Sequence, residues 1–170
     1  MKSYLSVILL LCLMSCGEEV DLQLLQGQSK GSTDSGHFEF IKYVSFEVDG
    51  KACKQQVRQY RAIKVFNGSL KPGDTIEAWG NVDSRQNMEG ERILLMKNYR
   101  PSPETEYDEC KKYMFSKYKS IHNWCCGIET DKKTGNKMVL FYKMLNSEQR
   151  GPDIPVKIET VYNALDANAK

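Results

Sequence analysis

Apolar residues at every second position are the feature that most constrains this fold, because that period is typical of half-buried β-strands. Between residues 38 and 48, five apolar side chains share one side of the chain with Lys42: Phe38, Phe40, Val44, Phe46 and Val48. Asp49 and Gly50 follow, and this pair favours a turn. The pattern predicts one long strand over residues 38–48.

Three more strands are expected before residue 98, over residues 56–66, 75–79 and 91–97. In the first of these, Val57, Ile63 and Val65 are expected on the buried face. The last is apolar enough to be buried on both faces. Between them lies Lys71-Pro72-Gly73-Asp74, where Pro and Gly suit the two central positions of a type II turn.

The hydrophobic period changes after Pro101 and Pro103. Five residues then recur at helical spacings of three and four: Tyr107, Cys110, Met114, Tyr118 and Ile121. The pattern predicts a helix that is capped by Thr105, or by Ser102 before Pro103, and that runs past Ile121. Acidic residues come first and lysines later, as the helix dipole favours. We interpret the adjacent Asp108 and Glu109 as part of this helix start.

The C-terminal third predicts a hairpin. Residues 138–145 and 156–162 are interpreted as its strands, and residues 163–170 as a short turn or frayed tail. Sequential strands with one helix set apart indicate a mainly β, α+β fold. The expected architecture is a closed or nearly closed antiparallel barrel with one packed helix and a C-terminal hairpin.

The N-terminus has the pattern of an export signal. An apolar run over residues 4–14 follows Lys2 and is shorter than the roughly 20 residues that a membrane-spanning helix needs. It ends in Leu13-Met14-Ser15-Cys16-Gly17, which resembles the bacterial lipobox, although Met14 departs from the usual residue. The resemblance implies removal of the signal peptide, residues 1–15, and acylation of Cys16. The alternative is a plain secretory signal in which Cys16 is incidental.

Lipid attachment at Cys16 implies a cell-envelope protein held at a lipid bilayer. By the sorting rule of the lipoproteins that this motif resembles, Gly17 instead of Asp after the cysteine implies the outer membrane in a cell with two membranes. Residues 16–36 are rich in Gly, Ser, Gln and acids, which predicts a lipidated, flexible tether, with a short strand or helix at Val20–Leu25 as the minor alternative. One domain is expected over residues 37–165 and a tail over 166–170. Removal of residues 1–15 leaves 23 basic against 22 acidic residues, a balance that argues against nucleic-acid binding.

Residues 60–95 carry a further resemblance. Its motifs are Phe66-Asn67-Gly68, Gly73-Asp74-Thr75-Ile76 and Gly90-Glu91-Arg92-Ile93-Leu94-Leu95. These resemble the netrin-like domain, the fold of tissue inhibitors of metalloproteinases. The resemblance implies an OB-type five-stranded barrel that binds proteins. It does not imply metalloprotease inhibition, because the inhibitors begin with a zinc-chelating Cys-x-Cys and no second cysteine lies close to Cys16 here.

Four cysteines remain after cleavage and acylation: Cys53, Cys110, Cys125 and Cys126. An even number outside the cytoplasm predicts two disulfides. Because a bond between adjacent cysteines forms a strained ring, we expect Cys53 to pair with one of the vicinal pair and Cys110 with the other. That pairing requires the helix to end near Lys117 or the chain to reverse at His122 and Asn123.

The alternative for the same residues is a metal or thiol site. His122 with Cys110, Cys125 and Cys126 would form a ligand set that suits zinc. The spacing matches no known zinc finger and the compartment oxidises thiols, so disulfides are preferred and neither metal nor cofactor is expected.

No catalytic motif of the G-x-S-x-G or H-E-x-x-H kind occurs, and no catalytic residue is assigned. Five aromatic residues could form a binding surface or simply pack: Trp79, Tyr99, Tyr107, Tyr113 and Trp124. We therefore expect a non-catalytic, membrane-anchored interaction module that presents loops 81–89 and 146–155 to a protein or envelope partner. A structural envelope lipoprotein without a discrete ligand is the alternative.

Overall fold

The computed structural model describes residues 20, 22–80, 89–122, 126–141 and 153–166. In these ranges the chain forms three helices and ten strands. In chain order they are α2 (Leu22–Lys30), β1 (Asp34–Val44), β2 (Glu47–Val48), β3 (Lys51–Ala52), β4 (Val57–Asn67), β5 (Thr75–Trp79), β6 (Glu91–Lys97), α3 (Glu109–Lys117), β7 (Lys119–Ile121), β8 (Gly127–Thr130), β9 (Lys137–Phe141), β10 (Ile154–Lys157) and α4 (Ile158–Asp166).

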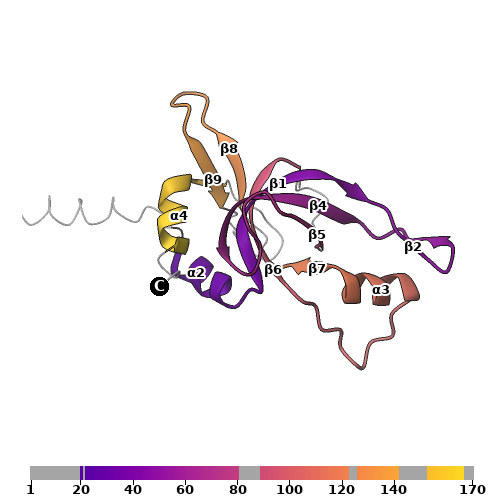
Figure 1. The fold of residues 1–170 in the computed structure, drawn as a ribbon. Helices are drawn as coiled ribbons and strands as arrows, with labels where there is room; N and C mark the ends of the chain where they lie inside the picture. Colours follow the sequence, from indigo (N-terminus) through magenta and orange to yellow (C-terminus); the bar gives the residue numbers. More distant parts are fainter. Residues whose placement is uncertain (1–19, 21, 81–88, 123–125, 142–152, 167–170) are drawn as a thin grey trace, which may run out of the picture.

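Five strands close into a barrel (Figure 1). The antiparallel pairs β1–β4 and β4–β5 are followed by a parallel pair, β5–β7, and then by the antiparallel pair β7–β6. Pairing of β1 with β6 completes the ring, so no barrel strand is left with an open edge. The predicted mainly β, OB-like closed barrel is confirmed.

The strands predicted over residues 75–79 and 91–97 are confirmed, because β5 and β6 begin and end at these residues. The turn between β4 and β5 is also confirmed. The amide of Asp74 donates to the carbonyl of Lys71 at 3.0 Å, and Gly73 has a φ of 95°. This positive φ is the reason that the position suits glycine.

The long strand predicted over residues 38–48 is interrupted. β1 ends at Val44, and β2 pairs with β3 in a separate small hairpin. In β4, the predicted buried face is correct for Val57 and wrong for Ile63, which is 40% exposed. Tyr60 and Ala62 are buried instead. Register shifts between β1 and β4 accompany this change of side.

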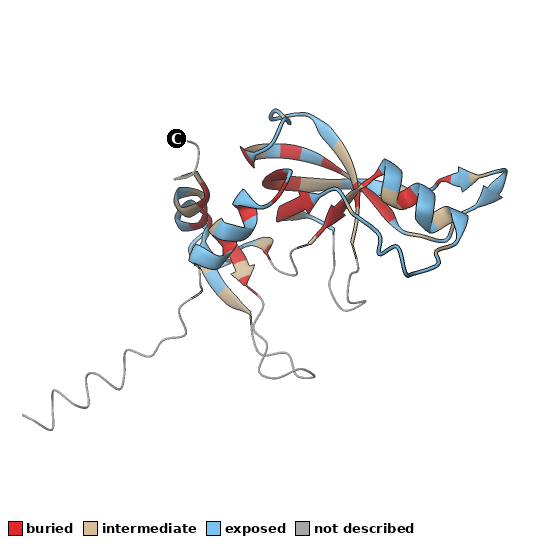
Figure 2. Ribbon diagram, turned by 90° about the horizontal axis from the view of Figure 1, so that it is seen from below, coloured by how far each residue is buried: buried red, intermediate tan, exposed pale blue. Residues whose placement is uncertain are grey.

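The core has three parts, which Figure 2 shows as buried residues along the barrel strands and on one side of each helix. The barrel interior contains Phe38, Tyr60, Ala62, Ala78, Leu94, Met96 and Ile121. A second cluster lies against α2 and α4, and a third, around Phe46 and Val57, lies against α3. Alternate residues of β6 enter the first two clusters, so this strand is buried on both faces as predicted.

The helix near residue 110 is shorter than predicted. Asp108, not Thr105 or Ser102, caps α3, with its Oδ1 accepting from the amide of Lys111 at 2.8 Å. This cap confirms the helix-start role of Asp108 and Glu109. The helix ends at Lys117, and the next residues form β7 instead of continuing it. Pairing with β5 and β6 decides the conformation of this segment.

The flexible tether predicted over residues 16–36 is wrong for residues 22–36. Leu22–Lys30 forms α2, and β1 begins at Asp34. Leu25 is 4% exposed and belongs to the same cluster as Leu165 of α4. The two helices lie side by side in Figure 1. Cys16 to Glu19 and Asp21 lie outside the described residues.

The C-terminal hairpin is confirmed for β9 and β10, which pair antiparallel. A further strand that was not predicted, β8, pairs with the other edge of β9. The strand predicted over residues 156–162 is wrong beyond Lys157, where α4 begins. Ile158, Val161 and Leu165 are its buried residues, and their spacings of three and four are helical.

Candidate functional site

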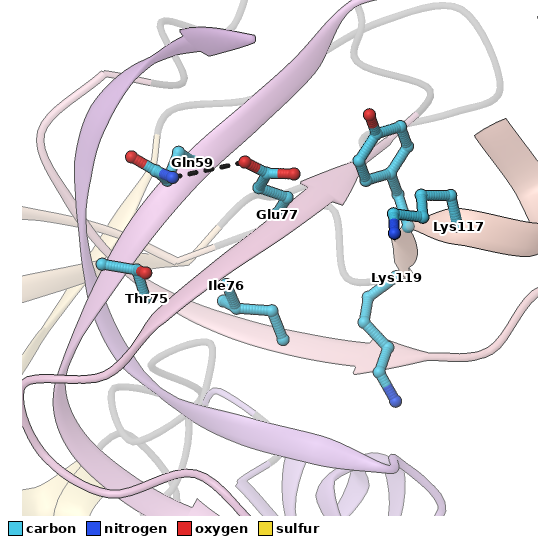
Figure 3. A pocket seen from close by; sticks show the side chains of 7 residues that line it. Gln59, Thr75, Ile76, Glu77, Lys117 and Lys119 are labelled. Atoms are coloured by element: carbon cyan, nitrogen blue, oxygen red, sulfur yellow. Dashed lines mark hydrogen bonds between the residues drawn. The ribbon is translucent and has the colours of Figure 1, made fainter. Parts of the chain in front are cut away.

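A shallow hollow of about 320 Å³ lies on the outer face of β4 and β5, beside the end of α3 (Figure 3). Its lining combines polar, charged and aromatic side chains: Gln59, Thr75, Ile76, Glu77, Lys117, Tyr118 and Lys119. Sequence reasoning assigned the binding role to loops 81–89 and 146–155, most of which lie outside the described residues. The hollow was missed because it joins three segments that are distant in the sequence.

The floor of the hollow is an amide–carboxylate pair. Gln59 and Glu77 are register partners on β4 and β5, and their neighbours Tyr60 and Ala78 point into the barrel. Alternation along a strand therefore places Gln59 and Glu77 on the outer face. Nε2 of Gln59 donates to Oε1 of Glu77 at 3.3 Å, as the dashed line in Figure 3 shows. The carboxylate is thereby held in place at the surface.

The wall of the hollow comes from the junction of α3 and β7. Tyr118 is largely buried there, and burial, together with Glu77 and Tyr113, raises the pKa of its phenol. Lys119 donates to Thr33 Oγ1 at 3.2 Å and lies 3.1 Å from a carboxylate oxygen of Asp34. The wall therefore holds one lysine, Lys119, in an ion pair.

Glu77 and Lys117 are the charged groups of the hollow that remain available. Within the described parts of the chain, neither forms an ion pair. A carboxylate and an ammonium group in one depression can bind a ligand that carries donors and acceptors together. The arrangement suits recognition.

The cysteine pairing expected from the sequence is wrong. Cys53 is bonded to Cys110, with Cα atoms 5.7 Å apart and 57 residues of separation. Because α3 begins at Glu109 and packs against β2, Cys110 lies in its first turn beside the small hairpin. Cys126 is also disulfide-bonded, and its partner lies outside the described residues, as do Cys16 and Cys125.

The alternative metal or thiol site loses two of its expected thiolates, because both Cys110 and Cys126 are in disulfides. Nε2 of His122 lies 2.9 Å from Oγ of Ser32, and burial, with the charge of Lys97, lowers the imidazole pKa. Across the described ranges, no three His, Cys, Asp or Glu side chains converge in a way that could hold a metal ion.

The aromatic residues singled out in the sequence form two groups. Trp79, Tyr99 and Tyr107 surround Phe115, which was not predicted, at ring-centroid distances of 4.9, 4.4 and 5.0 Å. Tyr113 instead stacks on Phe46 at 5.6 Å. Trp124 lies outside the described residues. The first group packs the segment after β6 against α3 and the end of β5.

Comparison with known proteins adds no assignment, since no family model, curated protein or solved structure matches the chain. Among the helices of the described residues, none combines the length and apolar character required to cross a membrane.

Proposed function

We propose that this protein is a non-catalytic binding module that is anchored to an envelope membrane through acylated Cys16 and docks a protein partner on the hollow of β4 and β5. The observation that carries the proposal is the pair of available charges, Glu77 and Lys117, in one depression on the outer wall of a closed barrel. A protein segment that presents a basic and an acidic group would complement both.

Two features support the location outside the cytoplasm. Disulfides persist in oxidising compartments, and both Cys53–Cys110 and Cys126 are in disulfide bonds. The apolar run over residues 4–14 and the Leu13–Gly17 motif support export and lipid attachment. The outer membrane is the membrane we propose, on the ground of Gly17.

The netrin-like relationship belongs to the same proposal. Its three motifs lie at the end of β4, at the start of β5 and along β6, which are barrel elements. The strand order and the parallel pair β5–β7 are compatible with an OB-type barrel. OB-folds bind ligands on the face of their second and third strands, which correspond in order to β4 and β5. This support is an analogy of fold.

Site-specific photocrosslinking on intact cells tests the proposal. A benzophenone amino acid in place of Thr75 is expected to yield one discrete heavier adduct. The same replacement at Glu129, which is exposed on β8, is the control and should yield none.

Charge reversal gives a second arm of the same test. Lys117→Glu should abolish the adduct formed from position 75, because it removes the available ammonium. Lys111→Glu is the matched control, since Lys111 is an exposed lysine of the same helix with its Nζ 3.9 Å from Asp108. Equal adducts from positions 75 and 129, or none from either, would contradict a docking role for the hollow and favour a structural envelope protein.

A further inference from the structure

Two arginines are buried at the inner face of the barrel. Arg58 is 4% exposed and Arg92 is 6% exposed. Each lies two residues before a member of the interior cluster, Tyr60 on β4 and Leu94 on β6. Because residues two apart on a strand share a face, both arginines belong to the inner face, on the opposite side of the wall from the hollow.

Arg58 has few partners for a buried cation. Its Nη2 donates to Oε1 of Gln56 at 3.1 Å, and its guanidinium carbon lies 5.6 Å from the centre of the Tyr43 ring. Its Nε and Nη1 atoms, and the fully buried hydroxyl of Tyr60, have no hydrogen-bond partner in the ranges that the structure describes. No described Asp or Glu forms an ion pair with Arg58.

The hydroxyl of Tyr60 lies within the influence of both cations. Burial raises the pKa of this phenol to about 12, and the charges of Arg58 and Arg92 oppose the rise. Burial lowers the pKa of Arg92, and repulsion by Arg58 adds to that effect. Two positive charges thus act on one buried hydroxyl. For Arg58, whose Nε and Nη1 have no hydrogen-bond partner in the described ranges, burial of the charge is strongly destabilising unless a negative charge with acceptor atoms is close.

We propose that Arg58, Tyr60 and Arg92 form an internal binding site for an oxyanion, a carboxylate or phosphate group of a small ligand. An oxyanion has several acceptor lone pairs and carries the opposite charge, so it would engage the unpaired donors of Arg58 and Tyr60. Arg92 would contribute a second positive charge. The site is independent of the proposed docking on the outer face, and each can fail without the other.

Thermal unfolding of the full mature protein tests the site, with sodium phosphate or sodium acetate replacing chloride at constant ionic strength. Wild-type Tm should rise in a saturable manner, by about 3–6 °C at a concentration ten times the Kd. A response to acetate alone indicates a carboxylate ligand, and a response to phosphate alone a phosphate ligand. Arg58→Met should weaken the binding by about 10–100-fold, because it removes charge-assisted hydrogen bonds.

Arg61→Met is the matched control. Arg61 is an exposed arginine of the same strand, paired with Glu39, and its loss should leave the anion response intact. If Arg58→Met does not fold, the arginine Nε signals of ¹⁵N-labelled wild-type protein show whether the anion binds at Arg58. The Arg58 signal, assigned with Arg58→Lys, should shift in a saturable manner with the active anion. No response to either anion, or an equal response in wild type and Arg58→Met, would overturn the proposal.

Discussion

The Nδ1 atom of His37 lies 2.5 Å from the phenolic oxygen of Tyr162, a contact that joins the first barrel strand to the C-terminal helix across 125 residues. His37 is 1% exposed, and burial lowers the pKa of its imidazole. Its Nε2 lies 2.9 Å from a carboxylate oxygen of Glu91, whose negative charge opposes this lowering of the pKa. Burial raises the pKa of Tyr162 to about 12, so its phenol stays protonated at neutral pH.

Removal of this hydroxyl should destabilise the protein. Tyr162→Phe keeps the ring contact with Phe66, at 5.4 Å, and leaves the buried Nδ1 of His37 without its hydrogen-bond partner. We expect the free energy of unfolding to fall by about 1–3 kcal/mol, measured by urea denaturation. Tyr113→Phe is the control, because Tyr113 is 38% exposed and its change should stay within about 0.5 kcal/mol. Equal stability of the two variants would contradict the role of the Tyr162 contact.

Stability should decrease as the pH falls below about 6.5. Burial lowers the pKa of both His37 and His122 from 6.5, so below that pH the unfolded chain binds more protons than the folded one. Each neutral imidazole contributes stability that is fully present above pH 6.5. This stability is lost as the pH falls toward the lower pKa of the folded state. Urea denaturation at pH 7.5 and 5.5 measures the difference. His37→Gln and His122→Gln should each reduce the difference in stability between the two pH values. If the difference is unchanged in both variants, the histidines are not its cause.

Loss of the Cys53–Cys110 bond should cost about 4 kcal/mol of stability, as expected for a closed loop of this length, 57 residues. The double variant Cys53→Ala/Cys110→Ala isolates this bond, whereas a reductant would also break the disulfide of Cys126. Urea denaturation without reductant compares it with wild type. A double variant as stable as wild type would show that the bond does not constrain the unfolded chain.

Helix α2 should behave as part of the domain. Leu25→Ala is expected to lower the free energy of unfolding by about 2–5 kcal/mol, because it leaves a cavity against α4. Leu24→Ala is the matched control, at a neighbouring position that is 59% exposed, and should change stability by less than about 0.5 kcal/mol. If chemical denaturation finds the two variants equal, residues 22–30 act as the tether that the sequence suggested.

Gly68 should tolerate alanine less well than Gly73. Both have a positive φ, 117° and 95°, so each substitution strains the backbone by about 1–2 kcal/mol. At Gly68 an added Cβ would also lie 2.5 Å from Oδ1 of Asp34 and 2.8 Å from the carbonyl of Thr33, whereas at Gly73 it would meet no atom within 4 Å. Thermal unfolding should therefore give a lower Tm for Gly68→Ala. Equal values would leave backbone conformation as the sole effect.

Local patterns predicted those parts of the barrel whose conformation depends on nearby residues. The bounds of β5 and β6 followed from hydrophobic period, and the turn at Pro72 and Gly73 from backbone preference. The candidate site could not be predicted in this way. Gln59, Glu77 and Lys117 become neighbours only because β4 pairs with β5 and α3 ends beside them, and no local signal marks that approach.

By itself, the sequence determined the β-rich class, four of the five barrel strands, the Asp108–Glu109 helix start and the presence of disulfide-forming cysteines, because residue period and backbone preference act over a few neighbours. Tertiary structure decided the rest. Residues 119–121 became a strand because β5 and β6 offered unpaired backbone groups, and Leu25 became buried because α4 offered an apolar face. Cys53 found Cys110 because the start of α3 packs beside the β2–β3 hairpin. These outcomes depend on free energy gained between distant segments, which a local pattern does not contain.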